Sequence, residues 1–110
     1  MTATKTNALK SIAANMRSHV TNSQRGAHQR LPRGLELVMQ RHVEDSGAVR
    51  WRLALGRTDV VPSEEEIRIC SEAFGVPAGT EHTVRTTERK NPKTGSINTW
   101  YVAEMYWYEA

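Results

Sequence analysis

Apolar and polar residues alternate along Leu35–Arg57, and this pattern predicts a β-hairpin. Alternation with a period of two is typical of strands that place one face on a core and the other in water. The turn is expected at residues 44–48. The predicted outer face carries Gln40, His42, Arg50 and Arg52. The predicted core face carries Leu35, Leu37, Met39, Val43, Val49, Trp51, Leu53 and Leu55.

A second hairpin is predicted over Thr80–Tyr108, where threonine, valine and aromatic residues flank the turn sequence Asn91–Gly95. Pro92 fixes φ for a type I turn, and Gly95 supplies a left-handed residue. We expect Lys90 to lie opposite Ser96. This register places Arg85, Arg89, Tyr101 and Trp107 on one face, and Val84, Trp100, Val102 and Tyr106 on the other. It also brings His82 opposite Glu104, and a shift of one residue would reverse the sorting.

Two helices are predicted. Ser63 and Glu66 form a capping box at the start of a helix over Glu64–Phe74, and Gly75 and Pro77 end it. A second helix is expected over residues 8–20, because Leu9, Ile12, Ala13, Met16 and Val20 recur at helical spacing. Residues 21–34 show no periodicity and indicate a flexible linker.

The order of elements, α-ββ-α-ββ, predicts an α+β fold. We expect a four-stranded antiparallel sheet, built from two β-hairpins, with one covering helix. The expected organisation is a basic N-terminal helix and flexible arm over residues 1–34, followed by a compact α+β domain over residues 35–110.

The charge of the chain is unevenly distributed. The 110 residues carry a net charge of +3. Residues 1–35 hold six basic residues and no acidic ones, whereas residues 36–110 hold nine basic and twelve acidic residues. Such segregation is typical of a basic arm on a nearly balanced body, and basic arms can neutralise phosphates. The alternative is that the arm docks on acidic surface of its own body or of a second copy of the chain.

No catalytic, cofactor or metal motif is found in the sequence. A single cysteine, Cys70, excludes an internal disulfide and favours a reducing cytosol, so we expect a cytoplasmic protein. The histidines lack the spacing of metal ligands. No apolar run is long enough to span a membrane. The pair of His82 and Glu104 is the only suggestion of a small enzyme, and an ordinary cross-strand pair explains it better.

Both faces of the last strand carry more apolar and aromatic residues than one small helix can cover. We therefore expect a non-enzymatic nucleic-acid-binding protein, DNA or RNA, in which a basic arm contacts phosphates and a face of arginines and aromatic rings provides stacking. The candidate residues are Arg25, Arg30, Arg33, Arg50, Arg52, Arg85, Arg89, Tyr101 and Trp107. The alternative is a protein-interaction module, a homodimer or inhibitor-like protein, that uses the surplus aromatic face.

Overall fold

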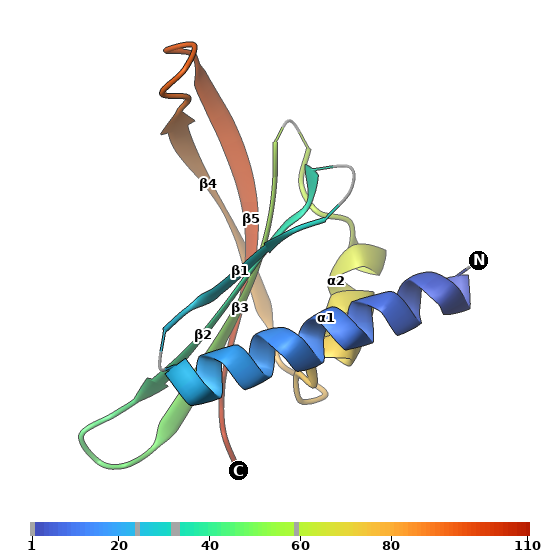
Figure 1. Cartoon of the computed structure of the whole chain (residues 1–110), viewed down its shortest axis with the longest axis vertical. Helices are drawn as coiled ribbons and strands as arrows, with labels where there is room; N and C mark the ends of the chain where they lie inside the picture. The colour runs from blue at the N-terminus through green and yellow to red at the C-terminus, as the bar shows by residue number, and fades with distance from the viewer. Residues whose placement is uncertain (1, 24, 32–33, 59) are drawn as a thin grey trace.

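The computed structural model describes residues 2–23, 25–31, 34–58 and 60–110, with side chains from Ala8 onward. Its described part contains two helices and one five-stranded antiparallel sheet (Figure 1). The helices are α1 (Thr2–Ser23) and α2 (Glu64–Phe74). The strands are β1 (Ala27–Arg30), β2 (Glu36–Val43), β3 (Val49–Thr58), β4 (His82–Lys90) and β5 (Ile97–Tyr108). Their order across the sheet is β1-β2-β3-β5-β4, so both expected hairpins are present and β3 and β5 join them.

The α+β class is confirmed, but the expected count of four strands is wrong. The fifth strand, β1, lies inside the segment interpreted as a linker. It pairs antiparallel with β2, with Ala27 opposite Met39 and Arg30 opposite Glu36. Only Ala27 of its four residues is buried, so the strand has no alternating pattern that the sequence could reveal. The extended conformation of β1 therefore depends on its hydrogen-bonded pairing with β2 more than on the strand propensity of its own residues.

Two helices, not one, cover the sheet, and they lie on the same face. Helix α1 packs on β1, β2 and α2, and it buries Leu9, Ala13, Met16 and Val20. These side chains join Leu37, Met39, Leu53, Leu55, Ala103 and Met105 of the sheet and Phe74 of α2 in one core. Helix α1 is longer than the predicted residues 8–20. Near its end, the hydroxyls of Thr21 and Ser23 donate to the carbonyls of Arg17 and His19 at 2.8 and 2.6 Å.

Helix α2 has the predicted bounds because its ends are encoded locally. Ser63 accepts a hydrogen bond from the amide of Glu66 at 3.1 Å, and the Glu66 carboxylate accepts one from the amide of Ser63 at 3.0 Å. This capping box satisfies amides that a helix end otherwise leaves without partners. At the other end, Gly75 adopts φ 73° and stops the helix in the left-handed conformation.

The register of the last hairpin differs from the prediction by one residue. Lys90 lies opposite Ile97, not Ser96, so Arg85 lies opposite Val102, not Tyr101. Ser96 belongs to the turn. Its carbonyl accepts from the amide of Asn91 at 2.8 Å, and its hydroxyl lies 2.7 Å from that of Thr94. One added turn residue exchanges the faces of β5 relative to β4.

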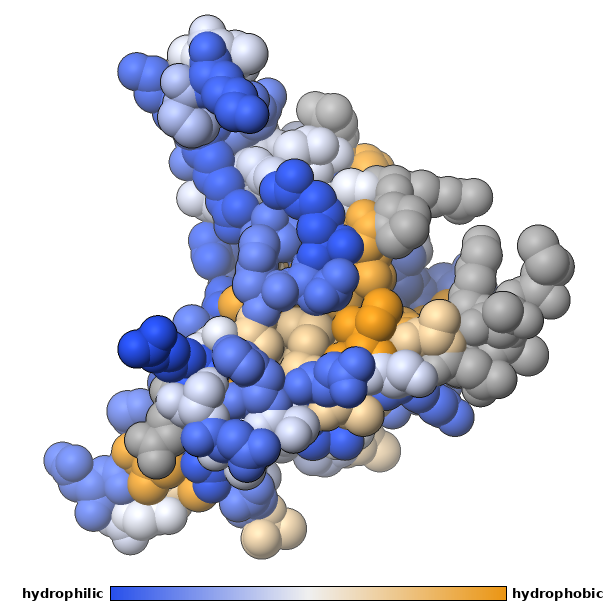
Figure 2. Space-filling view, in the orientation of Figure 1, coloured by the Kyte–Doolittle hydropathy of each residue, from blue (hydrophilic) through white to orange (hydrophobic). Residues whose placement is uncertain are grey.

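The β4–β5 hairpin extends beyond the rest of the sheet (Figure 1). Hydrophilic residues cover most of this projecting end on the helix side, whereas apolar residues come to the surface mainly in the middle of the molecule (Figure 2). Neither helix covers the other side of the sheet. That open face is therefore the large unoccupied surface of the described structure.

Candidate functional site

The open face of the sheet is strongly basic. Five arginines from three strands point to this face, in register with two glutamates, Glu36 and Glu104. The arginines are Arg30 on β1, Arg50 and Arg52 on β3, and Arg85 and Arg89 on β4. The described charged residues of the face therefore sum to +3. Three aromatic residues of β5, Trp100, Tyr106 and Tyr108, lie on the same face.

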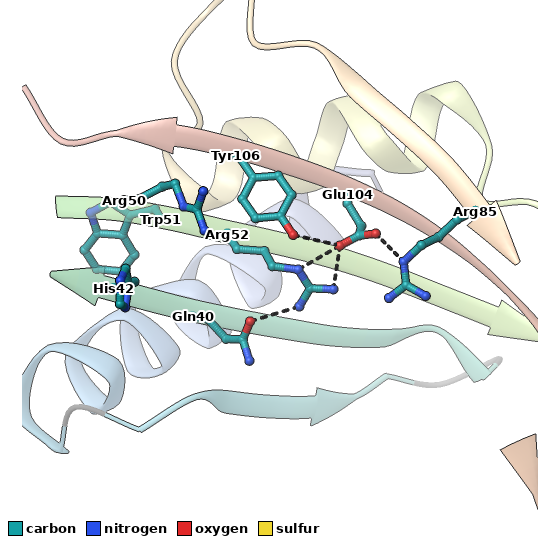
Figure 3. Close-up of a pocket in the computed structure, with 8 residues that line it drawn as sticks. All are labelled: Gln40, His42, Arg50, Trp51, Arg52, Arg85, Glu104 and Tyr106. Atoms are coloured by element: carbon teal, nitrogen blue, oxygen red, sulfur yellow. Dashed lines mark hydrogen bonds and ion pairs between the residues drawn. The ribbon is translucent and has the colours of Figure 1, made fainter. Parts of the chain in front are cut away.

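Glu104 organises the middle of this face (Figure 3). One of its oxygens lies 2.7 Å from Nη2 and 2.8 Å from Nε of Arg52, and it accepts from the hydroxyl of Tyr106 at 3.2 Å. The other oxygen accepts from Nε of Arg85. Arg52 continues the network by donating to Gln40 at 3.2 Å. A buried carboxylate thus fixes two guanidinium groups and one phenol in place.

A second carboxylate, Glu36, lies where β1, β2 and the hairpin meet. Its oxygens lie 3.1 Å from Nε2 of His28, 3.5 Å from Nη2 of Arg30 and 3.0 Å from Nη1 of Arg89. The Glu36 side chain is only 4% exposed, although its face of the sheet carries no helix. The side chains of its cationic partners cover it.

The pKa values of both carboxylates lie below their usual range. For Glu36, burial alone would raise the pKa, but hydrogen bonds from His28 and Arg89 outweigh it. For Glu104, burial also acts to raise the pKa, and the hydrogen bonds and charges of Arg85 and Arg52 lower it. Both groups are therefore ionised at neutral pH and hold their arginines by charge-assisted hydrogen bonds.

Trp100 packs between neighbouring elements of the open face, in contact with Arg89 of β4 and close to the backbone of β3. The Arg89 guanidinium lies 4.5 Å from the centroid of the ring. A Cβ placed on Gly56 would come 3.3 Å from Cε3 of Trp100, so the ring also lies close to the β3 backbone. The indole is therefore part of the packing of the open face.

Two arginines lie over the ring of Tyr106, but the residue remains accessible. Cζ of Arg50 lies 5.1 Å and Cζ of Arg52 lies 6.0 Å from the centroid of its ring, and the residue is 47% exposed. Tyr108, two residues further along β5, is 55% exposed and donates to Glu44 at 2.8 Å. Around Tyr106 the surface forms a hollow of about 440 Å³, lined by Gln40, His42, Arg50, Trp51, Arg52, Arg85, Glu104 and Tyr106 (Figure 3).

The structure brings most of the predicted basic residues together and separates them from the predicted rings. Arg50 and Arg52 share the outer face with Gln40 and His42, as the alternation predicts. Arg85 and Arg89 lie on this face too, but Tyr101 and Trp107 do not. Trp107 stacks on Trp51 on the helix side, with centroids 6.5 Å apart and an interplanar angle of 8°. Tyr101 lies opposite Arg57 on the same side.

The predicted basic arm is divided between the two sides of the molecule. Arg30 of β1 lies on the open face. Arg17 of α1 lies on the helix side and donates to the carbonyl of Ala73 at 3.3 Å. Arg25 is exposed between α1 and β1. Arg33 lies outside the described residues.

The structure also places His82 and Cys70. His82 lies opposite Met105, and Thr83 takes the place expected for it opposite Glu104, so the expected pair of His82 and Glu104 is wrong. Cys70 is buried in the core, where burial and the charge of Glu66 raise the pKa of its thiol to about 12. Within the described ranges, no group of three or more histidine, cysteine, aspartate or glutamate side chains could hold a metal ion.

Five members of the basic and aromatic face were not predicted from the sequence: Glu36, Glu104, Trp100, Tyr106 and Tyr108. Along β5, alternate residues point to opposite faces of the sheet, and this alternation is visible in the sequence. It sorts the aromatic residues of β5 into two sets, one for each face. The pairing of β3 with β5, which brings Tyr106 opposite Arg52, joins residues far apart in the chain. Only that pairing identifies which set of rings accompanies the arginines.

Comparisons with known proteins add no family to this description. No protein-family model matches the chain, and neither the curated proteins nor the solved structures give a significant match. No helix in the described part of the chain is long and apolar enough to cross a membrane.

Proposed function

We propose that this protein binds nucleic acid, without catalysing a reaction, through the open face of its sheet. The observation that carries the proposal is the accessible ring of Tyr106 with the guanidinium groups of Arg50 and Arg52 beside it. Aromatic rings and arginine planes on a sheet are a common surface for stacking bases and binding phosphates.

The distribution of charge supports this proposal. The five arginines of the open face exceed its two glutamates, and they come from β1, β3 and β4, so the excess positive charge extends across the sheet. Arg50 forms no ion pair with a carboxylate in the described part of the chain. Its charge is therefore available to a phosphate at a low desolvation cost.

The exposure of the rings supports it as well. Tyr106 and Tyr108 are among the most exposed large apolar residues of the described chain, and they lie on the same face as the arginines. An accessible aromatic ring inside a basic surface suits a ligand that is both planar and anionic. Nucleic acids have both properties.

Fluorescence anisotropy with labelled single-stranded and duplex oligonucleotides, measured over a range of salt concentrations, tests the proposal. The logarithm of the association constant should fall linearly with the logarithm of the salt concentration. Arg50→Gln should weaken binding and reduce the slope by about 0.7 to 0.9, the value for one phosphate contact. The absence of affinity for any oligonucleotide at low salt would reject the proposal.

Arg68→Gln is the matched control for this variant. Arg68 is an exposed arginine of α2, on the helix side, and it pairs with Glu72 at 3.4 Å. The substitution removes the same charge from the opposite side of the molecule. If both variants weaken binding equally, net charge and not the open face accounts for the affinity.

The second candidate function is protein association through Tyr101 and Trp107. It remains a proposal, and these two residues offer less exposed aromatic surface than Tyr106 and Tyr108 do. Both residues are partly buried, and Trp107 is stacked on Trp51. Sedimentation of the purified protein tests this alternative. A stable dimer that Trp107→Ala dissociates would favour it over nucleic-acid binding.

A further inference from the structure

We infer that the hollow around Tyr106 takes a single-stranded segment of nucleic acid, with an unpaired base stacked on the Tyr106 ring and its phosphates on Arg50 and Arg85. This inference rests on the proposed function and specifies the form of its ligand.

Tyr106 is held in a fixed position. Its hydroxyl donates to Glu104 at 3.2 Å, and Glu104 is itself held by Arg52 and Arg85. The ring therefore needs little further ordering when a base stacks on it, which reduces the entropic cost of binding. Tyr108 is also fixed, through Glu44, and offers a neighbouring ring for the next base.

Trp100 cannot take this role, although it is the largest ring on the open face. Arg89 lies over its ring at 4.5 Å, and Gly56 approaches it from the β3 backbone. A base could stack on Trp100 only after Arg89 had left both the ring and Glu36. Arginines also lie over the Tyr106 ring, at 5.1 and 6.0 Å, but Tyr106 is 47% exposed and Tyr108 is 55% exposed, whereas Trp100 is partly buried. Tyr106 and Tyr108 are therefore the more accessible rings of the open face.

Two arginines at the hollow retain donors for phosphates. Arg85 contacts Glu104 through Nε, and its side chain is 50% exposed, so its two Nη groups are left for another acceptor (Figure 3). Arg50 lies over the Tyr106 ring, with Cζ 5.1 Å from its centroid, and is in no ion pair with a described carboxylate. Arg52, in contrast, is committed to Glu104 and Gln40 and positions the ring. Arg50 and Arg85 thus provide cationic groups at the hollow for the sugar–phosphate chain.

The geometry favours an unpaired base. In a duplex, each base is stacked between its neighbours and presents only its edge in a groove, so its face cannot reach a protein ring. A single strand exposes base faces, and stacking on an aromatic side chain is tolerant of sequence. The hollow, at about 440 Å³, is in the size range of small-molecule pockets and suits one nucleotide rather than a helical segment.

The test is a comparison of a labelled oligothymidylate of about twelve nucleotides, within the usual range of single-strand site sizes, with a duplex of the same length. The full-length protein should prefer the single strand. Tyr106→Ala should weaken single-strand binding roughly five- to 150-fold, the range for loss of one stacked base. Tyr106→Phe keeps the ring but loses the hydrogen bond to Glu104, so it should weaken binding much less than Tyr106→Ala does. Tyr106→Ile has good strand propensity without a ring, and it should behave as Tyr106→Ala if the alanine variant folds poorly.

Photocrosslinking gives an independent readout. An oligonucleotide with a 5-iodouracil base should form its adduct at Tyr106 or Tyr108. Equal affinity for single strand and duplex, unchanged binding by Tyr106→Ile, or an adduct confined to Tyr101 or Trp107 would each overturn the inference and leave nucleic-acid binding as such in place. The absence of binding to either form would overturn both.

Discussion

Arg89 on β4 donates to both oxygens of Glu36 on β2, at 3.0 and 3.3 Å, although β5 and β3 lie between these two strands. Neighbouring strands are separated by about 4.8 Å, so a flat sheet would keep the two backbones roughly 14 Å apart. The contact therefore depends on twist, which turns the hairpin toward the rest of the open face. It joins the projecting hairpin to the opposite half of the sheet.

Glu36→Gln should destabilise the protein by about 1–3 kcal/mol, because charge-assisted hydrogen bonds to a buried carboxylate are lost. The lower half of this range is favoured, since the partner side chains Arg30 and Arg89 are about half-exposed or more and solvent screens them. Urea unfolding followed by circular dichroism measures the change in the free energy of unfolding.

The matched control for this substitution is Glu72→Gln on α2. Glu72 pairs with Arg68 at 3.4 Å, and both side chains are at least 60% exposed. An exposed pair of this kind contributes about 0.5 kcal/mol or less. Equal effects of the two substitutions would contradict the role assigned to Glu36.

The pH dependence of stability follows from three carboxylates. The pKa values of Glu36, Glu66 and Glu104 are lowered in the folded protein, for Glu66 because the hydrogen bonds of Ser63 and Arg57 outweigh the effect of burial. A lowered folded-state pKa contributes stability that is present above the unfolded-state value, near 4.3, and is lost as the pH falls through the folded-state pKa. Thermal unfolding from neutral pH to about pH 3 should show this loss.

Glu104→Gln separates this contribution from general acid unfolding. The variant lacks one of the three titrating groups, so its stability should depend less steeply on pH below about 4.3 than that of the unchanged protein. The same slope in the two proteins would mean that Glu104 does not contribute to the pH dependence.

Much of the fold could be predicted because the determining residues are close together in the sequence. The capping box at Ser63 and the left-handed Gly75 fix α2 at both ends, and alternation over Leu35–Arg57 identifies the β2–β3 hairpin. Each signal depends on a few neighbouring residues. The α+β class follows from these elements and their order.

The site could be predicted only in part, because its assembly depends on non-local pairing. The outer positions of Arg50 and Arg52 follow from local alternation. The rings beside them depend on the pairing of β3 with β5 and on one extra turn residue, Ser96, in the last hairpin. A slip of one residue leaves the hydrophobic pattern of β5 almost unchanged, since both of its faces are rich in apolar residues.

Gly56→Ala tests the enclosure of Trp100. The new Cβ would lie 3.3 Å from Cε3 of the indole, so the ring must shift, and overpacking of this kind costs about 1–3 kcal/mol. The intrinsic fluorescence of the folded protein should change as well. Gly26→Ala is the control, because its nearest atom, also at 3.3 Å, is Cγ of the flexible Gln40 side chain. Comparable destabilisation by both substitutions would argue against a tight Trp100 site.

Cys70 should be unreactive in the folded protein. Its pKa of about 12 leaves very little thiolate at neutral or mildly alkaline pH, and thiolate is the reactive form. A thiol reagent that reports by absorbance should therefore react slowly until urea unfolds the chain. Rapid reaction of the native protein would show that the α2–sheet contact opens frequently.

Glu104→Gln should also change the proposed binding. The substitution removes a negative charge and releases part of Arg52 and Arg85 from their carboxylate partner. The open face then has a larger positive charge, so affinity for nucleic acid at low salt should rise and the salt dependence should become steeper. Anisotropy titrations at several salt concentrations measure both. If affinity falls instead, positioning of Tyr106 and the arginines by Glu104 matters more for binding than the net charge of the face.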